Sequence, residues 1–173
     1  MKPNHKYIIP FKGLKDGKYD FHYNIGAEFF ESYEASDTRD ARLQASVLLV
    51  KKPTHLEVEV KVAGKVEIMC DRCLGYYYQE IENSGLIYVR FGEESGELAA
   101  DLVVLPQDET DLDVSQFVYD FAMLGLPIKR QHPADENNNS LCDPEMLNIL
   151  KSLNTRELNQ DDPRWDKLKN INN

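Results

Sequence analysis

The chain has 173 residues, of which 42% are hydrophobic, so it is long enough to fold around an apolar core. Its formal net charge of −10 argues against a broad nucleic-acid-binding face, because such faces are strongly basic. No apolar run reaches the roughly 18 residues of a membrane-spanning helix, and three cysteines without a signal peptide indicate reduced thiols or metal ligands, so we expect a cytoplasmic protein.

The N-terminal part is expected to form β-structure. Residues 7–11 and 19–23 are rich in aromatic and β-branched side chains and flank the Asp16-Gly17 dipeptide, which favours a tight hairpin turn. Residues 26–33 are ambiguous between a loop and a short helix. The sequence therefore predicts a hairpin of residues 7–23, followed by a short helix or loop.

Apolar and polar residues alternate most clearly in the next part of the chain. Leu43, Ala45, Val47 and Leu49 share one side of a predicted strand, and apolar residues recur at every second position of 56–62. This period of two is typical of antiparallel strands with one buried face. Gly64 interrupts the second pattern and predicts a bulge or bend.

Two further strands and a helix are predicted in the middle of the chain. Residues 76–81 and 86–91 are expected to be strands separated by a turn at Asn83-Ser84-Gly85. Asp113 is expected to begin a helix over 113–125, with Gln116 in the capping-box position and Gly125 and Pro127 ending it. This helix would close one end of the sheet.

The composition changes near residue 131, where a polar, asparagine-rich loop begins. Asp143-Pro144 and Asp162-Pro163 each have the residues of a helix start, so two short helices are expected after the loop. We therefore predict an antiparallel β domain over 1–130, and a loop and helical tail over 131–173 that pack on it or extend from it. The fold class is α+β: mainly an antiparallel β-sheet or a partly open barrel, with peripheral helices and a helical C-terminal tail.

A Cys-x-x-Cys pair at the tip of the central hairpin is the clearest chemical signal. Cys70 and Cys73 can present both sulfurs to one metal ion, and His132 and Cys142 in the late loop, residues 131–142, are the candidate remaining ligands. This donor set predicts one structural zinc ion. In the alternative interpretation the cysteines are only compact residues of a turn. A redox pair is disfavoured, because the residues after Cys73 are predicted to form a strand and not a helix.

Aromatic and basic residues near this pair are candidates for RNA contact. Tyr76 and Tyr78, near Arg72 and Arg90, could stack on bases, although alternating aromatics on a strand also pack across strands. Trp165 in the tail has two interpretations as well: it docks a tail helix onto the core, or it belongs to a helix that binds a partner.

Acidic residues are concentrated in one segment. Residues 93–126 contain nine Asp and Glu and neither Lys nor Arg. Such a run is either a solvated surface or a contact surface for a basic partner, such as a ribosomal protein. The sequence contains neither a P-loop, a dinucleotide-binding fingerprint nor a nucleophile elbow. We therefore expect a protein that is not an enzyme.

The order of these features resembles the YceD family. The resemblance covers residues 66–168, and its most specific parts are the Cys-x-Arg-Cys-Leu and Asp-Pro-Arg elements. The matching elements, in chain order, are the Cys-Asp-Arg-Cys-Leu motif (70–74), Asp-Leu-Asp (111–113), a helix ending in Leu-Pro-Ile (126–128), the late Cys142, and the terminal Asp-Pro-Arg-Trp motif (162–165) with Leu168.

The resemblance implies a role in accumulation of large-subunit (23S) ribosomal RNA, with which the family is associated in bacteria. The family also has relatives in chloroplasts. It adds Arg164 of the terminal motif to the candidate RNA contacts. Many members carry a second cysteine pair in the late loop, whereas this chain has Cys142 alone, so His132 would have to replace a thiol.

We therefore hypothesise a non-enzymatic factor that supports 23S ribosomal RNA accumulation and large-subunit assembly. Its expected partners are 23S ribosomal RNA or its precursor and a basic large-subunit ribosomal protein, with no membrane and no small-molecule substrate. Two alternatives remain open. One is a magnesium-dependent RNA-processing enzyme that uses Asp111 and Asp113, and the other is a protein-interaction module without RNA contact.

Overall fold

The computed structural model describes residues 5–33, 38–93, 96–99, 101–137 and 139–157. The chain divides into two compact units. The first consists of Met1–Met69 and Tyr76–Arg130, and the second of Cys70–Gly75 and Gln131–Asn173. Within the described ranges, none of the helices has both the length and the apolar character needed to cross a membrane.

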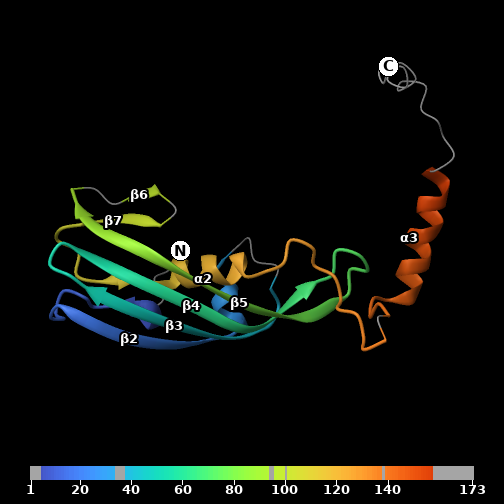
Figure 1. Cartoon of the computed structure of the whole chain (residues 1–173), viewed down its shortest axis with the longest axis horizontal. Helices are drawn as coiled ribbons and strands as arrows, with labels where there is room; N and C mark the ends of the chain where they lie inside the picture. Colours follow the sequence, from blue (N-terminus) through green and yellow to red (C-terminus); the bar gives the residue numbers. More distant parts are fainter. Residues whose placement is uncertain (1–4, 34–37, 94–95, 100, 138, 158–173) are drawn as a thin grey trace, which may run out of the picture. The chain divides into compact units, whose positions relative to one another are not determined.

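A six-stranded sheet forms the centre of the first unit, and its long strands are visible side by side in Figure 1. The strand order is β2-β3-β4-β5-β7-β6, and every neighbouring pair is antiparallel except β5 and β7, which are parallel. The strands span β2 (Gly17–Ile25), β3 (Ala41–Lys51), β4 (His55–Met69), β5 (Tyr76–Gly92), β6 (Gly96–Ala99) and β7 (Leu102–Pro106).

Shorter elements complete the chain. A 3-10 turn, η1 (His5–Tyr7), leads into β1 (Ile8–Ile9), which pairs antiparallel with β8 (Leu112–Asp113). The helices are α1 (Ala27–Phe30), α2 (Ser115–Leu124) and, in the second unit, α3 (Pro144–Glu157). The expected short helix after Gly26 is thus α1, and the helix expected after Asp143 is α3, with the Glu145 N–H donating to the Asp143 carboxylate at 2.8 Å.

The alternation of apolar residues is confirmed, because β3 and β4 bury every second side chain. One face of the sheet carries Leu43, Ala45, Val47 and Leu49 of β3 and the corresponding residues of β4, all buried. Helix α2 packs against β4 and β5. Its Phe117, Val118 and Ala122 are buried, so the core lies between α2 and this face of the sheet.

The sheet is open and not a closed barrel, so the first predicted alternative, a mainly antiparallel β-sheet, is confirmed and the barrel alternative is not. Strands β2 and β6 lie at opposite edges of the strand order and do not pair with each other. Closing a barrel requires the two edge strands to form hydrogen bonds with one another. Here the apolar face is covered by α2 instead of by strands curving back, and β6 contributes only four exposed residues.

The predicted hairpin of residues 7–23 is also wrong. Ile8 and Ile9 pair with Asp113 and Leu112, while β2 pairs with β3. Pro10 has no N–H to donate, so the strand stops after Ile9. The Phe11 N–H donates back to the Ile9 carbonyl at 2.9 Å, which turns the chain.

The turn predicted at Asn83-Ser84-Gly85 is absent, because β5 runs unbroken through these residues. Their role is to dock α2. A Cβ atom at Gly85 would lie 2.3 Å from Cε1 of Phe121, so any larger residue would require this ring to move. The Asn83 side-chain amide donates to the Phe121 backbone carbonyl at 3.1 Å. Turn-forming residue types here reflect close helix packing instead.

Two local predictions need smaller corrections. Helix α2 begins at Ser115, whose N–H donates to the Asp113 carboxylate at 2.8 Å, and Gln116 donates to Asp120 instead of forming a capping box. Gly64 is not a bulge, because the pairing register continues through it on both sides. It is required because its φ is +142° and a Cβ would lie 2.2 Å from the Arg42 carbonyl oxygen.

Replacing Gly64 should therefore destabilise the sheet. We expect Gly64→Ala to lower the free energy of unfolding by about 2 kcal/mol or more, since an alanine meets both an unfavourable φ and backbone atoms that cannot move aside. Gly13→Ala is the matched control: nothing lies within 4 Å of its Cβ position, and we expect a change within about 0.5 kcal/mol. Urea denaturation measures both, and equal stability of the two variants would contradict this account.

Candidate metal centre

The loop between β4 and β5 forms a tight knuckle around Cys70 and Cys73. The strands pair up to Met69 and Tyr76, and the loop continues this pairing as the Cys70 N–H donates to the Gly75 carbonyl at 2.9 Å. The Leu74 N–H then donates to the Cys70 carbonyl at 3.0 Å, with Leu74 in the left-handed region at φ 59°. The turn places both sulfurs on the same side of the loop, where they are buried.

The late loop is held in shape by Asp135. Its carboxylate accepts the N–H groups of Asn137 and Asn139 at 2.9 and 2.7 Å, and its own N–H donates to the Asn139 carbonyl at 2.9 Å. These hydrogen bonds lower the pKa of Asp135, and the one from the Asn139 backbone N–H has the largest effect. The closed turn removes most of the distance between His132 and Cys142, so their long spacing in the sequence does not prevent them from meeting.

The four predicted ligands converge within the second unit. The donor atoms of Cys70, Cys73, His132 and Cys142 all lie within 4.8 Å of one another. The Sγ atoms of Cys70 and Cys142 are 3.8 Å apart, and Sγ of Cys73 is 3.4 Å from Nδ1 of His132. Among the described residues this is the one group of three or more potential ligands.

The separations of 3.8 Å between two sulfurs and 3.4 Å between a sulfur and a nitrogen match a tetrahedral zinc site. Zn–S bonds of about 2.3 Å and Zn–N bonds of about 2.0 Å place tetrahedral sulfurs about 3.8 Å apart, and a sulfur and a nitrogen about 3.5 Å apart. Three thiols and an imidazole are soft and borderline donors that suit zinc. A complete set of four protein ligands leaves no position for a substrate, so the arrangement is that of a structural site and not a catalytic one.

The protein environment favours a thiolate at Cys70. Burial raises the pKa of Cys70, but the backbone N–H groups of Cys73, Arg72 and His132 and the imidazole of His132 lower it, to about 6 in total. The Arg72 N–H, for example, lies 3.4 Å from the Cys70 sulfur. At Cys142 the Ser140 hydroxyl lowers the pKa, but burial and the other two thiols raise it above its ordinary value. A negative charge at Cys70 thus makes ionisation of Cys142 less favourable, and a cation bound between the sulfurs would remove this penalty.

The described part of the second unit has little else to stabilise it. In its described part, only the side chains of the three cysteines are buried. The apolar residues of α3 are half-buried or exposed, including Leu153, which is 52% exposed. Units without an apolar core usually depend on a metal ion or disulfides. The geometry, the donor set and this missing core all favour a structural metal ion.

The candidate RNA-stacking tyrosines already have partners within the first unit. The Arg39 guanidinium lies 3.7 Å from the centre of the Tyr76 ring, and that of Arg42 lies 5.4 Å from the Tyr78 ring. The Tyr78 hydroxyl donates to the Asp40 carboxylate at 2.6 Å. The basic residues of the first 65 positions, which include these two arginines, are candidates for RNA contact by sequence, but the sequence does not single them out as partners of the tyrosines. Local residue types do not show contact between positions so far apart in the chain.

Two of the candidate RNA contacts, Tyr76 and Arg90, lie at opposite ends of β5. Arg72 is exposed in the knuckle, whereas Arg90 is exposed near the other end of β5, beside a cavity of about 300 Å³ lined also by Tyr88. Within β5, Tyr76 and Arg90 are separated by up to about 45 Å of strand. Arg164 and Trp165 lie outside the described residues. Tyr76 and Arg90 are thus far apart within the first unit.

Asp111 and Asp113 do not form a magnesium site with a third carboxylate in the described chain. The Asp111 carboxylate accepts a hydrogen bond from the Thr110 hydroxyl, and the Asp113 carboxylate accepts one from the N–H of Ser115, the first residue of α2. Both acidic residues therefore have local structural roles.

A family model described as the large ribosomal RNA subunit accumulation protein YceD matches residues 58–172. The match begins in β4 and includes all four candidate ligands. It extends beyond both ends of the resemblance noted over residues 66–168. Neither a curated protein nor a solved structure matches the chain significantly.

Because the four ligands converge, we expect protein purified without a histidine tag to contain one zinc ion per chain. We expect Cys70→Ser, Cys73→Ser and Cys142→Ser to lose it, because each removes one of four ligands. His132→Gln should lose it as well, whereas His22→Gln, at an exposed position of β2, should keep it. Mass spectrometry measures the zinc content of each variant. Wild-type protein without zinc, or a Cys142→Ser variant that retains it, would disprove the assignment.

Proposed function

The chain belongs to the YceD family, and from that premise we propose that it is a non-enzymatic factor that supports 23S ribosomal RNA accumulation and large ribosomal subunit assembly. It would do so by binding the RNA or its precursor, a ribosomal protein, or both. The observation that carries this proposal is the family match over residues 58–172, whose description names accumulation of the large ribosomal RNA subunit.

The metal centre fits this proposal as a structural device. Cys70, Cys73, His132 and Cys142 would hold a zinc ion that fastens the knuckle to the late loop. When bound, the ion would supply charge neutralisation for the thiolates and fix the backbone of residues 70–75. That fixed backbone presents Arg72, which is exposed between two ligands. A rigid arginine loses less conformational freedom on meeting a phosphate than a mobile one does.

Some basic residues of the first unit are paired with carboxylates, which makes them weaker candidates for RNA contact. On the exposed face of the sheet Lys61 pairs with Glu82 at 2.8 Å, and Lys65 pairs with Glu80 at 3.0 Å. Lysines already paired with carboxylates attract phosphate weakly. Arg72 and Arg90 have no ion pair among the described residues. These two arginines, with Arg164, are therefore the preferred phosphate contacts, and Tyr76 and Tyr78 could stack on bases only with Arg39 and Arg42 beside them.

The acidic segment supports a protein partner as well. Residues 93–126 carry nine acidic residues and no basic ones. A field of one sign attracts a basic protein and speeds encounter with it. A magnesium-dependent RNA-processing enzyme is the less supported alternative, because Asp111 and Asp113 are engaged in local hydrogen bonds. A protein-interaction module without RNA contact is the other alternative, and salt-sensitive RNA binding separates it from our proposal.

Removal of the gene should reduce large-subunit particles selectively. In a deletion strain we expect less 23S ribosomal RNA and fewer large-subunit particles, with small-subunit particles retained, because the proposed factor acts on one subunit. Sucrose-gradient sedimentation and RNA quantification measure this. Re-expression of the wild-type chain is the control, and a normal particle profile in the deletion strain would refute the proposal.

Single arginine substitutions should weaken RNA binding in a salt-dependent way. We expect Arg72→Gln, Arg90→Gln and Arg164→Gln each to lower affinity for a 23S ribosomal RNA transcript and to reduce the slope of log affinity against log salt by about 1. Lys61→Gln is the control, since its charge is paired with Glu82. Filter binding across a salt series measures the slope. Unchanged slopes for all three arginine variants would leave protein binding as the mode of action.

A further inference from the structure

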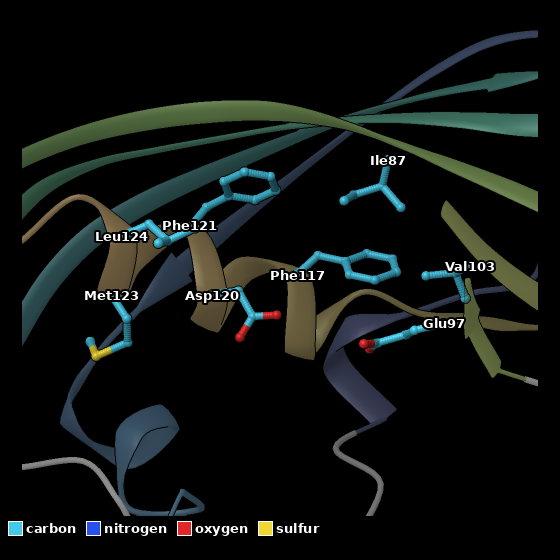
Figure 2. Close-up of a pocket in the computed structure, with 8 residues that line it drawn as sticks. All are labelled: Ile87, Glu97, Val103, Phe117, Asp120, Phe121, Met123 and Leu124. Carbon is cyan, nitrogen blue, oxygen red and sulfur yellow. The ribbon is translucent and has the colours of Figure 1, made fainter. Parts of the chain in front are cut away.

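An apolar groove in the first unit lies between α2 and the β5-β7-β6 edge of the sheet. Its cavity has a volume of about 430 Å³. Figure 2 shows the rings of Phe117 and Phe121 extending from α2 into the space below β5, with Ile87 and Val103 beside them. The lining residues are Ile87, Glu97, Val103, Phe117, Asp120, Phe121, Met123 and Leu124.

The apolar side chains of this groove are incompletely covered. Leu124, at the C-terminal end of α2, is 72% exposed. Phe121 and Met123 are only half-buried. A soluble domain usually covers large apolar residues that lie next to one another, unless they form a binding site. The size of the cavity is sufficient for one large apolar side chain from another molecule.

Two carboxylates give the groove its charge. Asp120 and Glu97 line it, and no lysine or arginine does. Burial raises the pKa of Asp120, the Gln116 amide lowers it, and the nearby Glu97 raises it further, so the pKa lies above its ordinary value. Two like charges beside an apolar surface are unfavourable for the free protein. They become favourable when a cation of a bound molecule lies between them.

We propose that this groove is the docking site for a segment of a basic protein that inserts one large apolar side chain next to Phe117 and Phe121 and places a flanking lysine or arginine at Asp120 and Glu97. The inference rests on the protein-partner part of the proposed function and names its site. Charge complementarity identifies the occupant: a purely apolar segment would leave the two carboxylates without a counter-charge, and RNA would be repelled by them.

Three short synthetic peptides of equal length test the site by fluorescence anisotropy. The first combines lysine and arginine with leucine and phenylalanine, the second keeps the basic residues but replaces the apolar ones by serine, and the third keeps the apolar residues but replaces the basic ones by glutamate. We expect the first to bind most tightly and its affinity to fall with salt. Equal binding of the first two peptides, or no binding of the first, would overturn the proposal.

Charge-neutral variants locate the binding. We expect the double variant Glu97→Gln/Asp120→Asn to weaken binding of the first peptide about tenfold, or about 1.4 kcal/mol. The double variant Asp16→Asn/Asp20→Asn removes the same charge at the opposite edge of the sheet, near and within β2, and should bind as the wild type does. Equal weakening by both variants would show a net-charge effect and would contradict a specific groove.

An apolar variant and amide chemical shifts provide the second readout. Leu124→Ser changes an exposed side chain, so the fold should be kept while peptide affinity falls. Nuclear magnetic resonance spectra should show shifts concentrated on α2, β6 and β7 when the first peptide is added. Shifts elsewhere would disprove the site. These measurements contain no RNA and no ribosomes, so their failure leaves the proposed function to be judged by the deletion strain alone.

Discussion

The second unit depends on one constraint, which is that three thiols and an imidazole occupy one small volume. Residues 70–75 and 131–142 meet there, and their buried side chains are the cysteines themselves. An ordinary apolar core provides cohesion without regard to direction. A tetrahedral metal site is directional, so an ion bound by these four ligands would fix the knuckle backbone more tightly than so few apolar atoms could. The positions of the knuckle residues between and after Cys70 and Cys73 would then follow from the ligands.

The first unit has a different organisation. Its long strands carry alternating side chains that form one apolar face, and α2 covers that face. Two residues of β5 contact α2 at one place. Gly85 has no side chain and leaves space for the Phe121 ring, and the Asn83 side-chain amide donates to the Phe121 backbone carbonyl. The helix in turn carries Phe117 and Asp120 to the groove. One missing side chain therefore determines where the acidic and apolar residues of α2 are presented.

The alternation of apolar residues and the types of the metal-ligating residues could be predicted from the sequence, whereas the pairing of distant segments could not. The alternation in β3 and β4 follows from burial on one face, and the four ligands follow from the chemistry of Cys and His. The predicted turn at residues 83–85 was wrong because glycine and asparagine are used both in turns and where a helix packs closely on a strand. The predicted hairpin of residues 7–23 was wrong because Pro10 ended the first strand and a later segment, β8, provided its partner. Local residue types do not reveal such distant partners.

The parallel pairing of β5 with β7 has a consequence for the edge of the sheet. Strand β7 pairs with only five residues of β5, from Tyr88↔Leu102 to Gly92↔Pro106, whereas β4 pairs along nearly the whole length of β5. Short peripheral ladders open at a lower free-energy cost than long central ones. The groove thus has one firm wall, formed by α2 and β5, and one yielding wall, formed by β7 and β6. Such an asymmetric cleft can adjust its width to side chains of different size without disturbing the core.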